Sequence, residues 1–146
     1  MKKTMLNGLG KNVLVSFFAA AILLSINSCS TKAAFLTSSV VPAARGSVKV
    51  KKDNNDNYHI QLHVDNLAEV KRLQPAKQSY VVWMESDQQA AKNIGQINSS
   101  SGMLSSRLKA TFEIVSSTKP SKIFITAEED ASVQYPGQVI LSTDTF

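Results

Sequence analysis

The fold of this chain is decided by two stretches of alternating sequence, Ser47-Val-Lys-Val-Lys51 and Tyr58-His-Ile-Gln-Leu-His-Val-Asp65, and by the cluster Asp53-Asn-Asn-Asp-Asn57 between them. In both stretches an apolar residue occupies every second position, which is the period of a β-strand with one buried and one solvated face. Aspartate and asparagine favour tight turns. The sequence therefore predicts a β-hairpin with one apolar face.

Further short strands are expected on the C-terminal side of this hairpin. Ser79 to Met84 is apolar at consecutive positions, which predicts a central strand buried on both faces, with Trp83 as its largest anchor. Other strands are expected within Lys92–Asn98, Leu104–Ile114, Lys122–Thr126 and Gln138–Ser142. About seven short strands without a long amphipathic helix predict an all-β fold, an antiparallel β-sandwich, over residues 39–146.

Two connecting segments have weaker patterns. Val40-Val41 runs into Pro42, which cannot donate to a strand ladder, so an edge segment or a loop is expected there. An exposed edge near Val40 would also permit dimerisation by strand addition. Residues 66–77 carry apolar side chains at three-residue spacing before Pro75, which predicts one short helical turn or an irregular crossover.

Residues 1–28 have the pattern of a signal peptide. Lys2, Lys3 and Lys11 form a basic N-terminal region, and a 12-residue apolar run follows from Val13 to Leu24. A helix that spans a bilayer needs about 20 apolar residues, so a permanent transmembrane helix fits less well. The segment is expected to be removed.

Cys29 is the expected site of lipid attachment. The residues Ile26 and Ser28 before it resemble the lipobox of bacterial lipoproteins, which has an aliphatic residue three positions before the cysteine and a small residue next to it. The alternative is an ordinary secretory signal that ends near a cysteine. Cys29 is the only cysteine in the chain, so it has no internal disulfide partner. Residues 29–38 are expected to be the lipidated cysteine and a short tether.

The charge of the chain depends on this processing. The precursor has a net charge of +5, whereas residues 29–146 hold 13 basic and 11 acidic side chains, a net charge of +2. No basic stripe with interleaved aromatic residues is present, so nucleic acid is not an expected partner. Ser30 after the cysteine is typical of outer-membrane lipoproteins in well-studied Gram-negative bacteria, which predicts a lipid-anchored protein on the periplasmic side of the outer membrane.

The stretch Tyr80-Val-Val-Trp83, followed by Asn93-Ile-Gly95 and the alternating strand Leu108–Ile114, resembles the extracytoplasmic domain of anti-sigma-K-type factors. The resemblance covers residues 48–141 and implies an immunoglobulin-like sandwich. The chain lacks the sigma-binding segment and the transmembrane helix of those regulators, so the resemblance does not imply sigma-factor binding. The chain is also similar to small uncharacterised lipoproteins of the Bacteroidetes group, which imply no activity.

The candidate ligand residues are the two histidines and the acid beside them. His59 and His63 share the outer face of one predicted strand, but four residues of strand span about 13 Å, too far for one metal ion without ligands from other strands. Asp65 or an acid on a neighbouring strand would have to complete a site. The alternative is two solvated histidines. The acidic stretches Glu128-Glu129-Asp130 and Asp53–Asn57 are expected to be polar loops rather than calcium sites, since no EF-hand pattern is present.

Aromatic side chains are candidates for a partner surface. Trp83 is expected in the core, whereas Tyr135, beside Pro136 and Gly137, is the expected exposed contact. No Gly-x-Ser-x-Gly sequence, no phosphate-binding glycine loop and no free thiol after lipidation are present, so catalysis is not expected. We therefore predict a non-catalytic interaction or structural module of the cell envelope, without a cofactor or small-molecule substrate and with a possible envelope protein partner. The alternative is a metal- or ligand-binding sensor domain. An envelope hydrolase has the least support.

Overall fold

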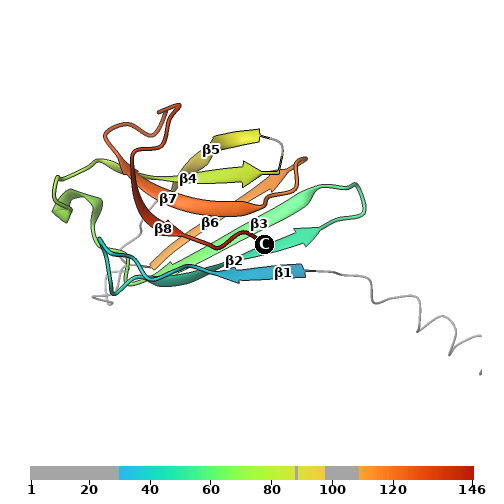
Figure 1. Ribbon diagram of the computed structural model, residues 1–146, viewed down its shortest axis with the longest axis horizontal. Coiled ribbons are helices and arrows are strands. Elements are labelled where there is room, and N and C mark those ends of the chain that lie inside the picture. The colour runs from blue at the N-terminus through green and yellow to red at the C-terminus, as the bar shows by residue number, and fades with distance from the viewer. Residues whose placement is uncertain (1–29, 88, 98–108) are drawn as a thin grey trace, which may run out of the picture.

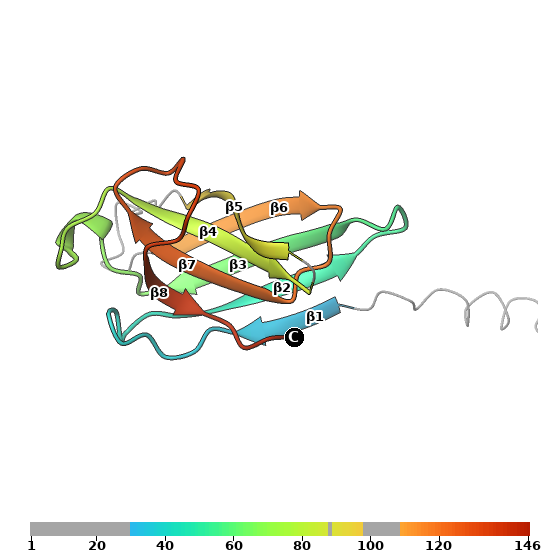
Figure 2. The same cartoon turned by 45° about the horizontal axis from the view of Figure 1, so that its top comes forward.

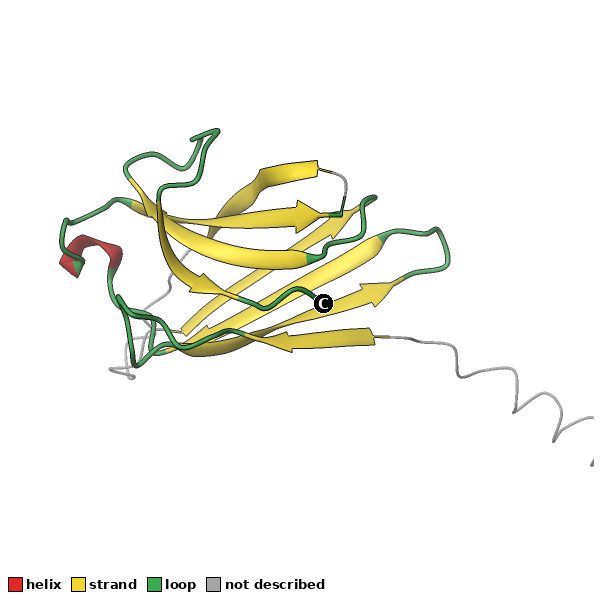
Figure 3. Cartoon of the chain, viewed as in Figure 1, coloured by secondary structure: helices red, strands yellow, loops and turns green. Residues whose placement is uncertain are grey.

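The computed structural model describes residues 30–87, 89–97 and 109–146, which form two antiparallel four-stranded sheets packed face to face (Figure 1). The first sheet contains β1 (Ser30–Ala34), β2 (Arg45–Lys52), β3 (Tyr58–Asp65) and β6 (Lys109–Ser116) in that order. The second contains β5 (Gln89–Ile97), β4 (Ser79–Ser86), β7 (Lys122–Glu128) and β8 (Gln138–Ser142). Almost all the regular structure is strand (Figure 3). The predicted all-β sandwich is confirmed.

Three connections join the two sheets. The chain crosses between the sheets after β3, after β5 and after β6, so β2, β3 and β6 face β5, β4, β7 and β8. These are the seven expected strands. The eighth strand, β1, pairs with β2 at the edge of the first sheet.

β1 lies where the sequence predicts a tether. None of its five residues is buried, so no alternation of apolar residues marks it. It is held by its backbone ladder with β2, in which Ser30 lies opposite Lys51 and Ala34 opposite Ser47. The predicted tether is therefore wrong from Ser30 on: residues 30–34 form β1, Phe35 is buried and bridges Thr143, and Ser38 is also buried.

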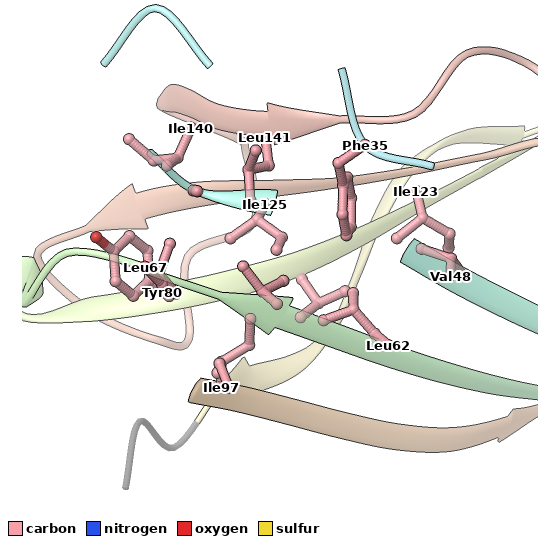
Figure 4. Packing of buried hydrophobic residues seen from close by; sticks show 14 of the residues in the cluster. Phe35, Val48, Leu62, Leu67, Tyr80, Ile97, Ile123, Ile125, Ile140 and Leu141 are labelled. Carbon is pink, nitrogen blue, oxygen red and sulfur yellow. The ribbon is translucent and has the colours of Figure 1, made fainter. Parts of the chain in front are cut away.

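The predicted hairpin is confirmed as β2 and β3. Their register places Val48 opposite Leu62 and Val50 opposite Ile60, and all four side chains are buried between the sheets. Phe35, Ile123 and Ile125 contribute to the same core from other segments (Figure 4). At about 25 cal/mol per Å² of buried apolar surface, such a core is the main source of folding free energy.

β4 is a central strand buried on both faces, as its continuous apolar sequence predicts. Its inward side chains, Tyr80, Val82 and Met84, belong to the core between the sheets. Its outward side chains, Val81 and Trp83, form a second cluster with Phe124 of β7. This outer cluster is covered by the loop between β7 and β8 (residues 129–137), which brings Ala131 and Val133 onto it.

Gly95 of the edge strand β5 lies against the Phe112 ring of the edge strand β6. Gly95 has φ +142°, and a Cβ there would lie 2.8 Å from the Phe112 ring of β6. Glycine adopts this backbone conformation without steric cost and leaves room for the ring.

The loops and strand ends outside the main hairpin agree with the sequence-based predictions only in part. Val40 and Val41 lie in the loop between β1 and β2, and the edge strands of this sheet are β1 and β6 rather than a strand near Val40. The helical turn is confirmed as η1 (Val70–Arg72), a 3₁₀ turn. The predicted strand over 104–114 is β6, and its expected first part lies outside the described residues. Within the described residues, no helix has the length and apolar composition to cross a bilayer.

Candidate functional site

The outer face of the first sheet carries both histidines. The register places His63 between Ser47 of β2 and Thr111 of β6, and His59 between Lys51 and Val115. The side chains on this face point away from the core because their neighbours along each strand are the buried residues. The face is polar, as the alternation predicts.

Each histidine has its own carboxylate partner. His59 Nε2 lies 3.1 Å from Asp53 Oδ2, and His63 Nε2 lies 3.2 Å from Asp65 Oδ2. Side chains of both pairs are partly exposed. The structure thus brings Asp65 to His63 but leaves His59 with an acid from the β2–β3 turn. Among the described residues, no three histidine, cysteine or acidic side chains gather as a metal-binding group.

A shallow hollow of about 580 Å³ lies on this face beside His63. Lys32 of β1 and Lys49 of β2 line it and are opposite each other in the ladder. On the far side, Gln61 Nε2 donates a hydrogen bond to Glu113 Oε1 at 3.1 Å. The β1 and β2 side of the hollow is therefore basic, and the β6 side carries the one acid among its lining residues.

The β2–β3 turn is organised by the carboxylate of Asp53. The backbone amides of Asn55 and Asn57 donate to Asp53 Oδ1 at 2.8 and 2.9 Å, and His59 contacts Oδ2. The Asn57 amide, with smaller contributions from Asn55 and His59, holds the pKa of Asp53 below its ordinary value.

This arrangement predicts a pH-dependent stability of the hairpin. A carboxyl group whose pKa is lowered by folding stabilises the fold above its unfolded-state pKa, and this contribution is lost as the pH falls through the folded-state pKa. We expect Asp53→Asn to lower the melting temperature modestly at neutral pH, and the difference from the wild type to shrink in acid. Circular dichroism melts over a pH series measure this. Asp56→Asn is the matched control, because Asp56 makes only an exposed ion pair with Lys52. An equal pH dependence in both variants would contradict the assignment.

Tyr135 lies in the β7–β8 loop and is 83% exposed. The loop is attached to the second sheet at two points. Asn93 Nδ2 of β5 donates to the carbonyl oxygens of Ala131 and Val133 at 2.8 and 3.0 Å, and Glu128 Oε1 accepts from the Gly137 amide at 2.7 Å. The predicted exposure of Tyr135 is confirmed, and its role as a contact residue stays a prediction.

The acidic stretch that begins this loop does not form a common site. Glu128 is buried and accepts from Gly137. Glu129 pairs with Lys77 at 3.0 Å, and Asp130 accepts two hydrogen bonds from Ser132. These bonds from Ser132 lower the pKa of Asp130. Glu129 and Asp130 lie in the loop, as the sequence predicts, whereas Glu128 is the last residue of β7 and is buried.

Two features of these sites were missed by sequence reasoning. The role of Asn93 could not be inferred, because its partners lie about 40 residues away in the chain. The basic side of the hollow was missed because β1 was expected to be a tether, although the concentration of lysines in residues 45–52 was a usable signal.

Trp83 is fully buried, as expected. It stacks on Phe124 with 6.1 Å between ring centroids, and its Nε1 donates to Thr126 Oγ1 at 2.7 Å. Its position beneath the β7–β8 loop makes it a structural residue rather than part of an exposed groove.

Cys29, the predicted lipidation site, lies outside the described residues, directly before β1. The resemblance to anti-sigma-K-type domains and the predicted location stay predictions. Comparisons of the chain with protein-family models, with curated proteins and with solved structures found no match.

Proposed function

We propose that this protein is a bacterial lipoprotein whose β-sandwich serves as a non-catalytic interaction or structural module of the cell envelope. In this proposal residues 1–28 are removed and lipid on Cys29 holds the domain on the membrane. Ser30 after the cysteine favours the outer membrane, with the domain facing the periplasm. Three acyl chains, as on processed bacterial lipoproteins, would make the attachment effectively permanent, whereas one would give only reversible binding.

One observation carries the proposal. The lipobox pattern places the mature N-terminus at Cys29, and the next residue, Ser30, pairs with Lys51 in the β1 ladder. Cleavage before Cys29 would therefore leave every strand of the described residues intact. This compatibility of the expected cleavage point with the described strands supports the proposed processing.

The interaction role is supported by the loop that carries Tyr135. An aromatic side chain that is 83% exposed is available to a partner, and the loop is already ordered by Asn93 and Glu128. A preformed loop loses less conformational entropy on binding than a flexible one. The envelope partner we propose is a protein that contacts this loop.

The alternative, a metal- or ligand-binding sensor, has less support. His59 and His63 are engaged by different carboxylates, and their separation along β3 is unfavourable for a shared metal. The hollow beside His63 is the feature that keeps a ligand possible.

The proposed anchor predicts that acylation and processing are both lost when Cys29 is replaced. We expect the wild-type protein from its native membranes to lack residues 1–28, to carry acyl mass on Cys29 and to partition into detergent. Cys29→Ala should lose the acyl mass and the normal processing. Intact mass spectrometry and detergent phase partitioning measure both.

The control is Ser30→Ala, which changes the adjacent exposed residue and leaves the thiol in place. It should be acylated like the wild type. A mature wild-type chain that is unacylated and recovered in the aqueous phase would contradict the anchor.

A further inference from the structure

The charge of the sandwich is concentrated on two neighbouring strands. β1 and β2 together hold five basic side chains and no acidic one. Residues 29–146 hold 13 basic and 11 acidic side chains, so the rest of the mature chain carries 8 basic and 11 acidic side chains. The net positive charge of the mature chain is therefore a property of one edge of the first sheet.

Three lysines of these strands lie on the outer face beside Ser30. Ser30 and Lys32 alternate on β1, and the register places Lys51 opposite Ser30 and Lys49 opposite Lys32. All three lysines are exposed. The ion pairs within the described part of the chain involve none of them.

The lysines are close to the point where the chain leaves the domain towards Cys29. With a rise of about 3.3 Å per residue and a strand spacing of about 4.8 Å, their Cα atoms lie roughly 5 to 8 Å from that of Ser30. The Debye length at physiological ionic strength is also about 8 Å. Because Cys29 is bonded to Ser30, a lipid on Cys29 would hold the charged groups within the electrostatic reach of the bilayer surface.

We propose that the outer face of β1 and β2 lies on the bilayer and that Lys32, Lys49 and Lys51 contact anionic phospholipid headgroups there. The proposal rests on the proposed lipid anchor, and it adds the orientation of the domain. Like charges directly opposite each other in a sheet, as Lys32 and Lys49 are, destabilise the pair unless a counter-charge is present. The hollow that both lysines line on its β1 and β2 side has room for a headgroup phosphate.

This orientation has a consequence for the partner surface. The β7–β8 loop packs on Val81, Trp83 and Phe124, on the outer face of the second sheet, which is the opposite side of the sandwich (Figure 2). With the lysine face on the membrane, the loop with Tyr135 points away from the lipid and towards an envelope partner.

The three lysines are expected to give the domain a strong preference for the orientation in which they contact the membrane. A lysine near an anionic surface contributes about 1 kcal/mol, which is roughly a fivefold preference. Three lysines would favour the membrane-bound orientation on the order of 100-fold over an upright one. The lipid anchor and the lysines belong to the same molecule. Once the lipid is inserted, the effective concentration of headgroups at the lysines is high, and even a weak contact is populated.

Lysine footprinting on the anchored protein tests the orientation. The lipidated protein is placed in vesicles of phosphatidylcholine alone or of phosphatidylcholine with phosphatidylglycerol, and lysines are modified with a water-soluble amine-reactive ester. Mass spectrometry then gives the extent of modification at each lysine. We expect Lys32, Lys49 and Lys51 to be modified several-fold less on the anionic vesicles. Exposed Lys71 and Lys92 should react equally on both.

Two variants with the same change in net charge separate a local contact from a general attraction. Lys49→Glu with Lys51→Glu should restore modification of Lys32 on anionic vesicles. Lys71→Glu with Lys92→Glu, on η1 and β5, should leave Lys32 protected. All four positions are exposed, so the fold is expected to tolerate the substitutions.

The failure of the anchor and the failure of the orientation can be told apart. Intact mass of the same preparation reports acylation. If the native protein is unacylated, the chain from residue 29 is coupled through the Cys29 thiol to a maleimide phospholipid and footprinted again. Equal modification of the three lysines on neutral and anionic vesicles would overturn the orientation in either preparation. Protection that needs an added periplasmic extract would assign the face to an acidic protein and would also overturn it.

Discussion

Replacing Trp83 by alanine should lower the free energy of unfolding by about 3 to 5 kcal/mol, the range measured for large aromatic side chains removed from a core. The indole is fully buried, stacks on Phe124 and donates to Thr126 Oγ1 at 2.7 Å. Its removal leaves a cavity on the outer face of the second sheet and one unsatisfied buried hydroxyl. Chemical denaturation followed by circular dichroism measures the loss.

The same substitution should also weaken the β7–β8 loop, because Ala131 and Val133 pack on the Trp83 cluster. Amide hydrogen exchange within residues 129–137 is expected to become faster in Trp83→Ala. The control is Tyr135→Ala, which removes an aromatic side chain from the loop at an exposed position and should cost no more than about 0.5 kcal/mol. A loss below about 1 kcal/mol for Trp83→Ala would show that the second cluster contributes little to stability.

Replacing Gly46 by alanine should destabilise the fold by about 1 to 3 kcal/mol, the usual cost of forcing extra atoms into a packed site. Alanine in place of glycine within a strand ordinarily stabilises it, because glycine loses more backbone entropy on folding. At Gly46 the sign is expected to reverse. A Cβ there would lie 2.3 Å from the carbonyl oxygen of His63 and 3.0 Å from Val64 Cα. Both atoms belong to the backbone of β3, so the strand itself would have to move.

Ser47→Ala is the matched control for Gly46→Ala. Ser47 is the next residue of β2, faces outward and lies opposite His63. We expect its replacement to change the free energy of unfolding by no more than about 0.5 kcal/mol. Urea unfolding of both variants tests the contrast. Equal stability of the two would mean that the close approach of β2 and β3 relaxes without cost.

The hairpin and the central strand could be predicted because their signals are local. In β2 and β3 the alternating pattern indicates which side chains are buried. The aspartate and asparagine residues between the strands favour a tight turn, which joins them as a hairpin. In β4 the continuous apolar run can be satisfied only by burial on both faces, and the structure shows this with Tyr80 inside and Trp83 outside. Loop residues 129–137 cover the outer face, which no local pattern could indicate.

The candidate site was only partly predictable. The alternation of β3 placed His59, His63 and Asp65 on an exposed face, and this is confirmed. The partner of His59 is Asp53, six residues earlier in the chain and across the turn. The position of the Asp53 carboxylate depends on the conformation of the turn. The backbone amide of Asn57 donates a hydrogen bond to this carboxylate and so helps to fix it.

The sequence by itself determined the class of the fold, the main hairpin and the central strand, because each depends on side-chain periodicity. Lipid attachment at Cys29, which follows from a short linear pattern, stays a prediction. The tertiary structure decided the role of residues 30–34. β1 buries no side chain and exists because its backbone groups pair with β2, an interaction between segments that leaves no trace in periodicity. That pairing places Lys32 beside Lys49, with Lys51 opposite Ser30, the residue that follows the proposed anchor Cys29. The basic face is therefore a product of strand register, which is set by contacts distant in sequence rather than by any single segment.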